Sequence, residues 1–128
     1  MVTGLKVTGL HLTRRPVTRP YPETRAYTPL RFRGAHQLNP EACVVCQACA
    51  RACPVDCLTV DGYRGENRRF VLTRFEIDYT RCMFCDLCVD ACPPKCLVMG
   101  PQFEMAGLSR QSLVWELPQL VPSGEGSP

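Results

Sequence analysis

The chain has 128 residues, about the length of one domain, and a formal net charge of +3. Its ten cysteines, twelve prolines and nine glycines argue against a core of apolar packing alone and indicate a disulfide or metal scaffold. The sequence has no run of 18 apolar residues and no secretory h-region, so we expect reduced thiols, no transmembrane helix, and metal sites rather than disulfides.

The N-terminal arm, residues 1–39, is basic. Residues 1–40 carry seven Lys or Arg against one acid, whereas the rest of the chain carries more acids than bases. The segment MVTGLKVTGLHL predicts a short amphipathic helix that forms against a partner or an interface. The segment RRPVTRPYPE predicts an extended polyproline II path, whose arginines either form a solvated linker or contact anionic membrane headgroups. The arm lacks interleaved base-stacking aromatics, so nucleic acid is not an expected partner.

The cysteines define an internal duplication. Five of them are each followed by a second cysteine at one constant spacing, which we call the repeat offset and which equals the separation of Cys43 and Cys82 along the sequence. The segment ACPVDCL is repeated as ACPPKCL at the same offset. The first set is Cys43, Cys46, Cys49, Cys53 and Cys57, and the second set is Cys82, Cys85, Cys88, Cys92 and Cys96. Each repeat predicts a tight loop through its first three cysteines, a helical turn or two over residues 47–53 or 87–92, a stop at proline, and a short strand.

Two strands are predicted between the cysteine loops. Residues 58–62, LTVDG, alternate in polarity and end at a turn at Asp61-Gly62. Residues 70–80 bring the chain back with β-branched and aromatic side chains, and residues 63–69 form the polar turn between the strands. The body is therefore predicted to be a small α+β unit with pseudo-twofold symmetry.

The spacing of the cysteines predicts two 4Fe-4S clusters. A Cys-x2-Cys-x2-Cys loop points three sulfurs at one centre, and a fourth cysteine four residues later, followed by proline, reaches the other cluster of a two-cluster ferredoxin. The predicted ligands are Cys43, Cys46, Cys49 and Cys92 for cluster 1, and Cys82, Cys85, Cys88 and Cys53 for cluster 2. Zinc is the alternative, but zinc sites usually pair two short Cys-x2–4-Cys arms across a longer gap.

The predicted fold class is α+β, a ferredoxin-like two-4Fe-4S domain with a pseudo-twofold repeat, flanked by extended N- and C-terminal arms. The predicted boundaries are residues 1–39 for the N-terminal arm, 40–100 for the ferredoxin domain, and 101–128 for the C-terminal arm, whose last residues are expected to be disordered.

The remaining candidate residues suggest no substrate chemistry. Cys57 and Cys96 follow their prolines and are expected to be buried structural residues rather than ligands or a disulfide. His11 and His36 have no partners at nucleophile spacing and are expected to be surface or packing residues. No G-x-G-x-x-G or Walker loop occurs, so this chain is expected to bind no nucleotide and to move electrons without a substrate-converting site.

Four segments together resemble a known family. RRPVTRPYPE, RFRGAHQL, the cysteine runs joined by FEIDYTRCMFC, and FEMAGLSRQSLV are similar to the subunit I family of NADH:quinone oxidoreductase, respiratory complex I, and to its photosynthetic relative. The resemblance covers nearly the whole chain and matches the eight predicted ligands. It implies a peripheral subunit on the cytoplasmic face of the inner membrane, seated on membrane subunits, whose two clusters pass electrons towards the last cluster before quinone. The chain is short at both ends, and many members have Ala at the position of Cys57, of Cys96 or of both.

Three other functions stay open at this point. An equivalent subunit of a membrane-bound nickel-iron hydrogenase or formate hydrogenlyase complex would carry similar cysteine runs. A free, soluble 2×4Fe-4S ferredoxin would be expected to have an acidic docking face and short ends, whereas this chain is basic at one end and extended at both. A zinc-stabilised interaction module is the third.

Overall fold

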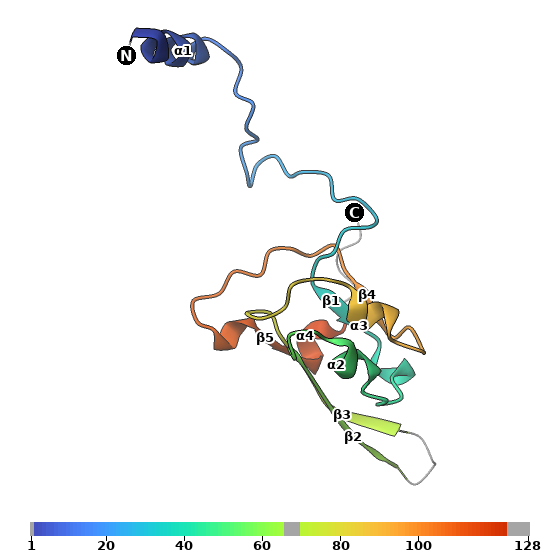
Figure 1. Cartoon of the computed structure of the whole chain (residues 1–128). Helices are drawn as coiled ribbons and strands as arrows, with labels where there is room; N and C mark the ends of the chain where they lie inside the picture. The colour runs from blue at the N-terminus through green and yellow to red at the C-terminus, as the bar shows by residue number, and fades with distance from the viewer. Residues whose placement is uncertain (1, 66–69, 123–128) are drawn as a thin grey trace.

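The computed structural model describes residues 2–65 and 70–122 (Figure 1). Its helices are α1 (Val2–Leu12), α2 (Ala48–Ala52), α3 (Leu87–Asp90) and α4 (Leu117–Leu120), with short 3-10 turns at Pro40–Ala42 and Gln111–Leu113. Its strands are β1 (His36–Leu38), β2 (Leu58–Arg64), β3 (Phe70–Asp78), β4 (Leu97–Met99) and β5 (Val114–Glu116). Within the described ranges, no helix is long and apolar enough to cross a membrane. The last residues of the C-terminal arm, for which disorder is predicted, lie outside the described residues.

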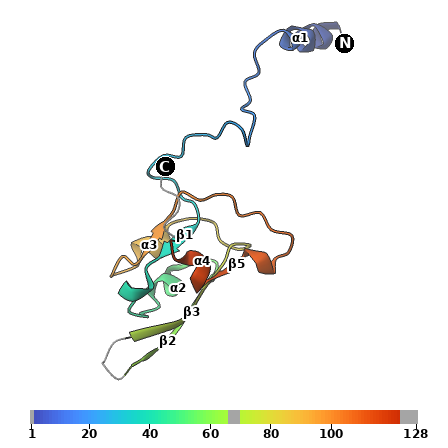
Figure 2. The ribbon, with the colours of Figure 1, turned by 180° about the vertical axis from the view of Figure 1, so that it is seen from behind.

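The N-terminal arm projects away from the body. Helix α1 lies far from the sheets in the two opposite views of Figures 1 and 2, and none of its residues is buried. Leu5 remains 78% exposed in the middle of the helix. The second half of the arm contacts the segment after β4, because the Tyr21 hydroxyl donates a hydrogen bond to Glu104 and the Arg25 guanidinium pairs with the same carboxylate.

Two small antiparallel sheets form the body. One pairs β1 with β4, and the other has the order β2-β3-β5. Leu38 lies opposite Leu97 in the first sheet, and Ile77 lies opposite Leu58 in the second. The repeat offset carries Leu38 to Ile77 and Leu58 to Leu97, so equivalent residues of the two repeats occupy equivalent positions in the two pairings.

The predicted turn at Asp61-Gly62 is wrong. Strand β2 continues through this pair to Arg64, and the register with β3 shifts between Asp61 and Gly62, as at a β-bulge. A Cβ atom at Gly62 would lie 2.5 Å from the Val71 carbonyl oxygen, so glycine is required there by the close approach of β3 rather than by a turn. The start of the predicted polar turn therefore belongs to β2, and residues 66–69 of that turn lie outside the described residues.

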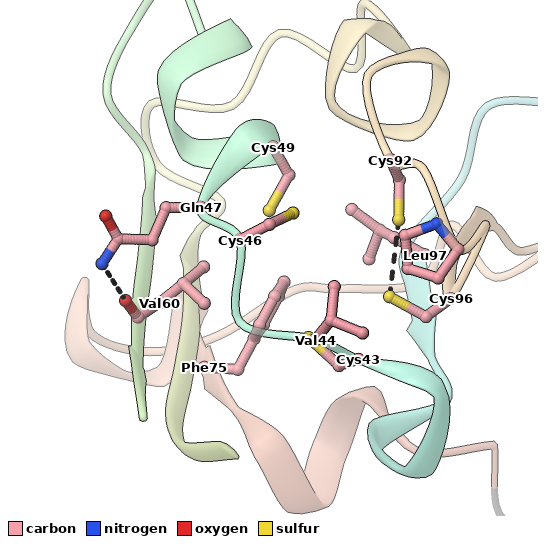
Figure 3. Close-up of a pocket in the computed structure, with 11 residues that line it drawn as sticks. Cys43, Val44, Cys46, Gln47, Cys49, Val60, Phe75, Cys92, Cys96 and Leu97 are labelled. Atoms are coloured by element: carbon pink, nitrogen blue, oxygen red, sulfur yellow. Dashed lines mark hydrogen bonds between the residues drawn. The ribbon is translucent and has the colours of Figure 1, made fainter. Parts of the chain in front are cut away.

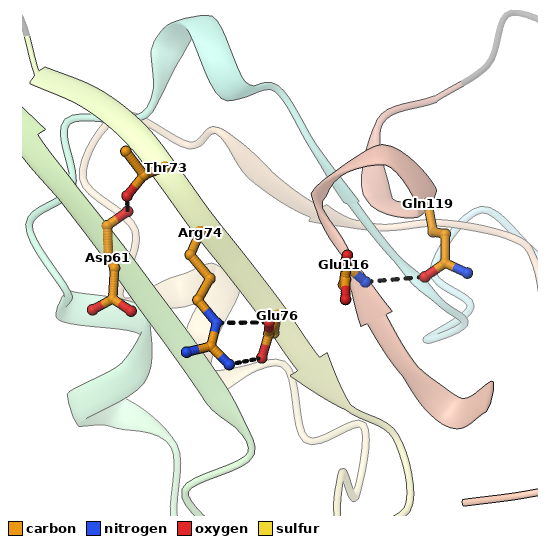
Figure 4. A network of polar contacts seen from close by, with 6 residues as sticks. All are labelled: Asp61, Thr73, Arg74, Glu76, Glu116 and Gln119. Carbon is orange, nitrogen blue, oxygen red and sulfur yellow. Dashed lines mark hydrogen bonds and ion pairs between the residues drawn. The ribbon is translucent and has the colours of Figure 1, made fainter. Parts of the chain in front are cut away.

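Polar side chains of the β2-β3 hairpin contact one another and the backbone (Figure 4). Arg74 donates two hydrogen bonds to Glu76, at 2.6 and 2.8 Å, and the Thr73 hydroxyl donates to the Asp61 carbonyl at 3.1 Å. Because such exposed pairs contribute little to stability, the hairpin depends mainly on its buried face.

Segments on both sides of residues 40–100 pack on the sheets. Strand β1 precedes this range and pairs with β4, while β5 pairs with β3 and continues into α4. Helix α4 begins with a capping box in which the Glu116 N–H donates to the Gln119 side chain at 3.0 Å (Figure 4). Gly34 of the RFRG motif lies against the chain beyond β4, where an added Cβ would come within 2.6 Å of the Gly100 carbonyl oxygen.

The core combines apolar residues from both sheets with cysteines. Phe75, Ile77, Leu38, Leu97 and Leu120 are each at most 1% exposed. Six cysteines are buried with them, namely Cys49, Cys53, Cys57, Cys88, Cys92 and Cys96. The apolar core is small, and thiols fill the space between the two sheets and the two short helices α2 and α3.

Candidate functional site: two cysteine-lined cavities

The first cavity gathers cysteines from both repeats. Cys43, Cys46 and Cys49 line it from the first repeat, and Cys92 lines it from the second. In Figure 3 the sulfurs of Cys46, Cys49 and Cys92 point towards the space between the two segments. The other lining residues are Val44, Gln47, Val60, Phe75, Pro94, Cys96 and Leu97. The empty space among these side chains, including the solvent at its open side, is about 310 Å³.

The second cavity has the reciprocal arrangement. Cys82, Cys85 and Cys88 line it from the second repeat, and Cys53 lines it from the first. The other lining residues are His36, Val55, Cys57, Leu58, Met83 and Asp86. Its volume is about 270 Å³ on the same measure. The structure therefore brings the eight candidate ligands together in two groups of four, each with three cysteines from one repeat and one from the other.

Unusual backbone conformations shape both loops. Among the described residues, six non-glycine residues have positive φ and form three pairs related by the repeat offset: Val45 and Phe84, Gln47 and Asp86, and Asp56 and Lys95. A left-handed residue costs roughly 1–2 kcal/mol, so the fold must hold six strained positions. Alternating right- and left-handed residues turn successive N–H groups towards one concavity, an arrangement found at many anion and iron-sulfur sites.

Each short helix directs the fourth cysteine away from its own loop. Helix α2 carries Cys49 at its second residue and ends at Ala52, and Cys53 is its C-cap. Helix α3 carries Cys88, and Cys92 follows its C-cap Ala91. Helices α2 and α3 are in contact with each other, so the cysteine that follows each helix lies at the cavity of the opposite repeat.

The electrostatics of the cavities disfavour bare thiolates. Burial raises the pKa of Cys49 to about 11 and that of Cys88 to about 12, and neighbouring cysteines add to both shifts. Burial also acts to raise the pKa of Cys53, but hydrogen bonds led by the Cys57 N–H outweigh it, so the pKa of Cys53 is lowered. Cys49 and Cys88 would thus need a cationic partner to ionise at neutral pH.

The donor set fits a thiolate-bound cluster. Five cysteines line each cavity, four of them candidate ligands, and soft thiolate ligands are the ones that hold iron-sulfur clusters and zinc. Across residues 2–65 and 70–122, no three His, Cys, Asp or Glu side chains are grouped around a position for a single metal ion. Each cavity gathers four candidate thiolate ligands, the number that a 4Fe-4S cluster takes.

The two additional cysteines lie beside the candidate ligands. Cys57 and Cys96 are buried, as predicted, at 5% and 7% exposure. Their sulfurs are each 3.4 Å from a candidate ligand, Cys57 from Cys53 and Cys96 from Cys92. Burial raises the pKa of both thiols. Their contact with the ligands was not anticipated from the sequence.

His36 is the functional candidate that sequence reasoning missed. The prediction of a surface or packing residue is incomplete, because His36 is buried at 2% exposure and lines the second cavity. Its Nε2 lies 3.4 Å from the Cys88 sulfur, and its Nδ1 lies 3.2 Å from the Tyr79 hydroxyl. Burial lowers the pKa of His36 to about 4, against the opposing charge of Asp86. No local sequence signal points to it; the repeat offset relates His36 to Phe75, whose place at the first cavity is known only from the structure.

Comparisons with known proteins identify a 4Fe-4S domain in the same part of the chain. A family model described as a 4Fe-4S dicluster domain matches residues 42–96. The NADH-quinone oxidoreductase subunit I of Edwardsiella ictaluri is 43% identical, and that of Escherichia coli strain K12 is 42% identical; each alignment covers 98% of this chain and 72% of the relative. The prediction of a mixed helix-and-sheet ferredoxin-type domain with two 4Fe-4S clusters is confirmed.

A solved structure shares the fold. It belongs to the membrane-bound sulfane sulfur reductase, an archaeal respiratory membrane complex, and it superposes with a TM-score of 0.60 at 29% sequence identity. The match covers 85% of this chain, which spans 55% of that larger chain.

Proposed function

The chain belongs to the NADH-quinone oxidoreductase subunit I family, and on that premise we propose that it is the electron-transfer subunit of a membrane-associated NADH:quinone oxidoreductase. The observation that carries the proposal is the pair of cavities, each of which gathers four candidate cysteine ligands drawn from both repeats. A 4Fe-4S cluster bound in each cavity would accept and release one electron at a time.

The chain's own residues hold and shield the two centres in this proposal. Cys43, Cys46, Cys49 and Cys92 are the ligands of cluster 1, and Cys82, Cys85, Cys88 and Cys53 are the ligands of cluster 2. The crossed ligands tie the two repeats together, which accounts for a stable body with few apolar core residues. Val60, Phe75 and Leu97 cover the first cavity and exclude water from it, and such cover helps set a reduction potential.

The two centres are adjacent. The pKa of Cys88, in the second set, is raised by burial, by the charge of Cys82 in its own set, and by the charge of Cys49 in the first set. Contact between α2 and α3 supports the same arrangement. Short separation is what a relay requires, since one electron can then pass from one side of the subunit to the other in two short steps. The pseudo-twofold relation between the halves, supported by the matched registers and positive-φ pairs, places the two centres in similar surroundings.

The N-terminal arm is the proposed attachment to the rest of the complex. Its exposed helix α1 and exposed arginines Arg14, Arg15 and Arg19 would contact membrane subunits and anionic headgroups on the cytoplasmic face. The partners are therefore other peripheral-arm and membrane subunits. This chain contributes electron transfer to the oxidoreductase and binds neither nucleotide nor nucleic acid in the proposal.

The hydrogenase, formate hydrogenlyase and free-ferredoxin alternatives are not favoured. The curated relatives compared above, which cover 98% of the chain, are NADH-quinone oxidoreductase subunit I proteins, and the structural neighbour belongs to a respiratory membrane complex.

Purification of the native complex through a tag on this chain tests the proposal. We expect integral-membrane and quinone-reducing companions by mass spectrometry, and about eight irons with matching acid-labile sulfide per chain. A hydrogenase large subunit among the companions would contradict the assignment to quinone reduction. Zinc in place of iron would contradict the electron-transfer function itself.

A further inference from the structure

The two cavities are built alike but differ at one buried position. The repeat offset makes His36 of β1 correspond to Phe75 of β3. His36 lies opposite Met99, and Phe75 lies opposite Val60, and the same offset relates these two partners. His36 lines the second cavity and Phe75 lines the first. One repeat therefore presents an imidazole where the other presents a benzene ring.

We assign the proton of the neutral His36 ring to one nitrogen from the hydrogen-bond partners of that ring. The Tyr79 oxygen accepts a hydrogen bond from the His36 backbone N–H at 2.9 Å. The Tyr79 hydroxyl proton is then available to the ring, and we assign Nδ1, which lies 3.2 Å from the Tyr79 oxygen, as its acceptor. With Nδ1 as acceptor, the neutral ring carries its proton on Nε2. Nε2–H is thus a donor, and the atom that it faces at 3.4 Å is the sulfur of Cys88.

Tyr79 is itself held firmly in place. It is 8% exposed, it stacks with Phe84 at an interplanar angle of 13°, and it meets Trp115 edge to face with ring centroids 5.0 Å apart. Its backbone N–H donates to the Leu113 carbonyl at 2.9 Å. The hydroxyl that orients His36 therefore has little freedom, and the Nε2–H remains aimed at Cys88.

We propose that His36, oriented by Tyr79, is a positioning residue that donates a hydrogen bond to the Cys88 ligand and raises the reduction potential of cluster 2. The inference rests on the proposed function. Added electron density on a cluster spreads to its sulfurs, so a donor to one of them stabilises the reduced state more than the oxidised state. One electron arrives from a reduced one-electron donor in the complex, which loses it, and His36 keeps its proton throughout.

No equivalent donor serves the first site. Among the described residues, the sulfur of Cys49, the counterpart of Cys88, accepts no side-chain hydrogen bond, and its neighbour Phe75 has no donor. His36 thus makes two duplicated centres inequivalent. Asp86 of the second cavity occupies the position of Gln47 in the first, and its negative charge lowers the reduction potential of cluster 2, against the effect of His36. The proposal therefore concerns the shift that His36 causes in the potential of cluster 2, and not which cluster has the higher potential.

The test is an EPR-monitored redox titration of the full-length chain carrying both clusters. In His36→Phe, which copies the first repeat, we expect the potential of cluster 2 to fall by about 59 mV, the equivalent of a tenfold change for a one-electron couple. Cluster 1, in the same molecule, is the internal control and should not move. Cluster 2 is recognised as the one whose spectrum changes in Cys85→Ser.

Two further variants keep the test decisive if His36→Phe does not retain cluster 2. His36→Gln keeps an N–H donor at a similar reach and should restore most of the potential. Tyr79→Phe removes the hydroxyl that fixes the tautomer and should lower the potential in the same direction by a smaller amount. An unchanged cluster 2 in all retained variants, or an equal shift of both clusters, would overturn the proposal. Absence of two 4Fe-4S signals from the unmodified chain would instead overturn the proposed function.

Discussion

At the scale of single residues, the two cavities carry different side chains at some positions that the repeat offset relates, and Gln47 and Asp86 are one such pair. Gln47 lines the first cavity and donates its side-chain N–H to the Val60 carbonyl at 3.2 Å. Its counterpart Asp86 lines the second, and its buried Oδ1 has no hydrogen-bond partner among the described residues. A negative charge beside a cluster stabilises the oxidised state relative to the reduced one. Asp86 should therefore hinder electron uptake at the site where His36 assists it.

The charge of Asp86 can be removed without changing its shape. Asp86→Asn keeps a residue that tolerates the left-handed backbone found there, at φ 74°. We expect the potential of cluster 2 to rise, measured by EPR-monitored titration, while that of cluster 1 stays constant. Gln47→Glu is the matched change and should lower the potential of cluster 1. A fall of the cluster 2 potential in Asp86→Asn would show that the carboxylate acts through hydrogen bonding rather than through its charge.

At the scale of elements, the short helices decide which cavity each thiol serves. Helix α2 spans only Ala48–Ala52, and this single turn separates Cys49 from Cys53 and sends them to different cavities. The geometry also places Cys57 next to Cys53, with 3.4 Å between the sulfurs. A thiol this close can take over as a ligand when its neighbour is replaced. A single substitution at Cys53 is therefore an incomplete test of crossed ligation.

The crossed assignment is best tested in a chain without the additional thiol. Cys57→Ala alone should keep both EPR signals, because Cys57 is not a proposed ligand. Addition of Cys53→Ser should then abolish or alter the signal of cluster 2, while the signal of cluster 1 and about half of the iron remain. Loss of cluster 1 alone would contradict crossed ligation. Cys53→Ser without the second change should be milder, since Cys57 can substitute for the missing ligand.

Helix α4 is a second element whose contribution can be measured. Leu120 is 1% exposed and belongs to the core cluster, whereas the next residue, Val121, is 36% exposed. Leu120→Ala removes a fully buried side chain and should cost about 2–5 kcal/mol. Cluster release in urea, followed by the loss of visible absorbance, should occur at lower urea concentration than in the unmodified chain. Val121→Ala is the matched control and should change the midpoint little; equal midpoints for both variants would show that α4 does not support the body.

At the scale of the whole molecule, the grouping of the cysteines was predictable from the sequence, whereas the packing of β5 and the place of His36 were not. The spacing of cysteines acts locally, through a loop and one helical turn, so the two groups of four could be inferred from sequence before any fold was known. Strand β5 pairs with β3 across a long stretch of chain, as Trp115 opposite Ile77 shows, and no local pattern encodes that contact. The bulge at Gly62 was mistaken for a turn because Asp-Gly in a sequence is typical of turns, and glycine also occurs at β-bulges. His36 was missed because its partners Cys88 and Tyr79 lie far along the chain.

The separation of arm from body makes a prediction for the molecule as a whole. Helix α1 buries none of its residues, and a Cβ atom added at Gly4 or Gly9 would meet no atom outside the helix backbone within 4 Å among the described residues, so the body does not depend on it. Deletion of residues 2–12 should leave both EPR signals and the urea midpoint of the chain unchanged. The same deletion should reduce recovery of the chain with the membrane subunits, because the lost surface is the proposed contact.

Salt dependence then separates the two kinds of contact that the arm can make. Replacement of Arg14, Arg15 and Arg19 by Gln removes charge but keeps α1. If the arm contacts anionic headgroups, this variant should detach from membranes at lower salt than the unmodified chain, because each arginine near the surface contributes about 1 kcal/mol. If α1 instead packs on a protein subunit, the arginine variant should stay bound and only the deletion should release it. Full recovery of both variants with the membrane fraction would show that the arm does not attach the chain to the membrane subunits. The body would then make that contact, and the exposed Met83 and Val44 beside the two cavities would be the next surface to test.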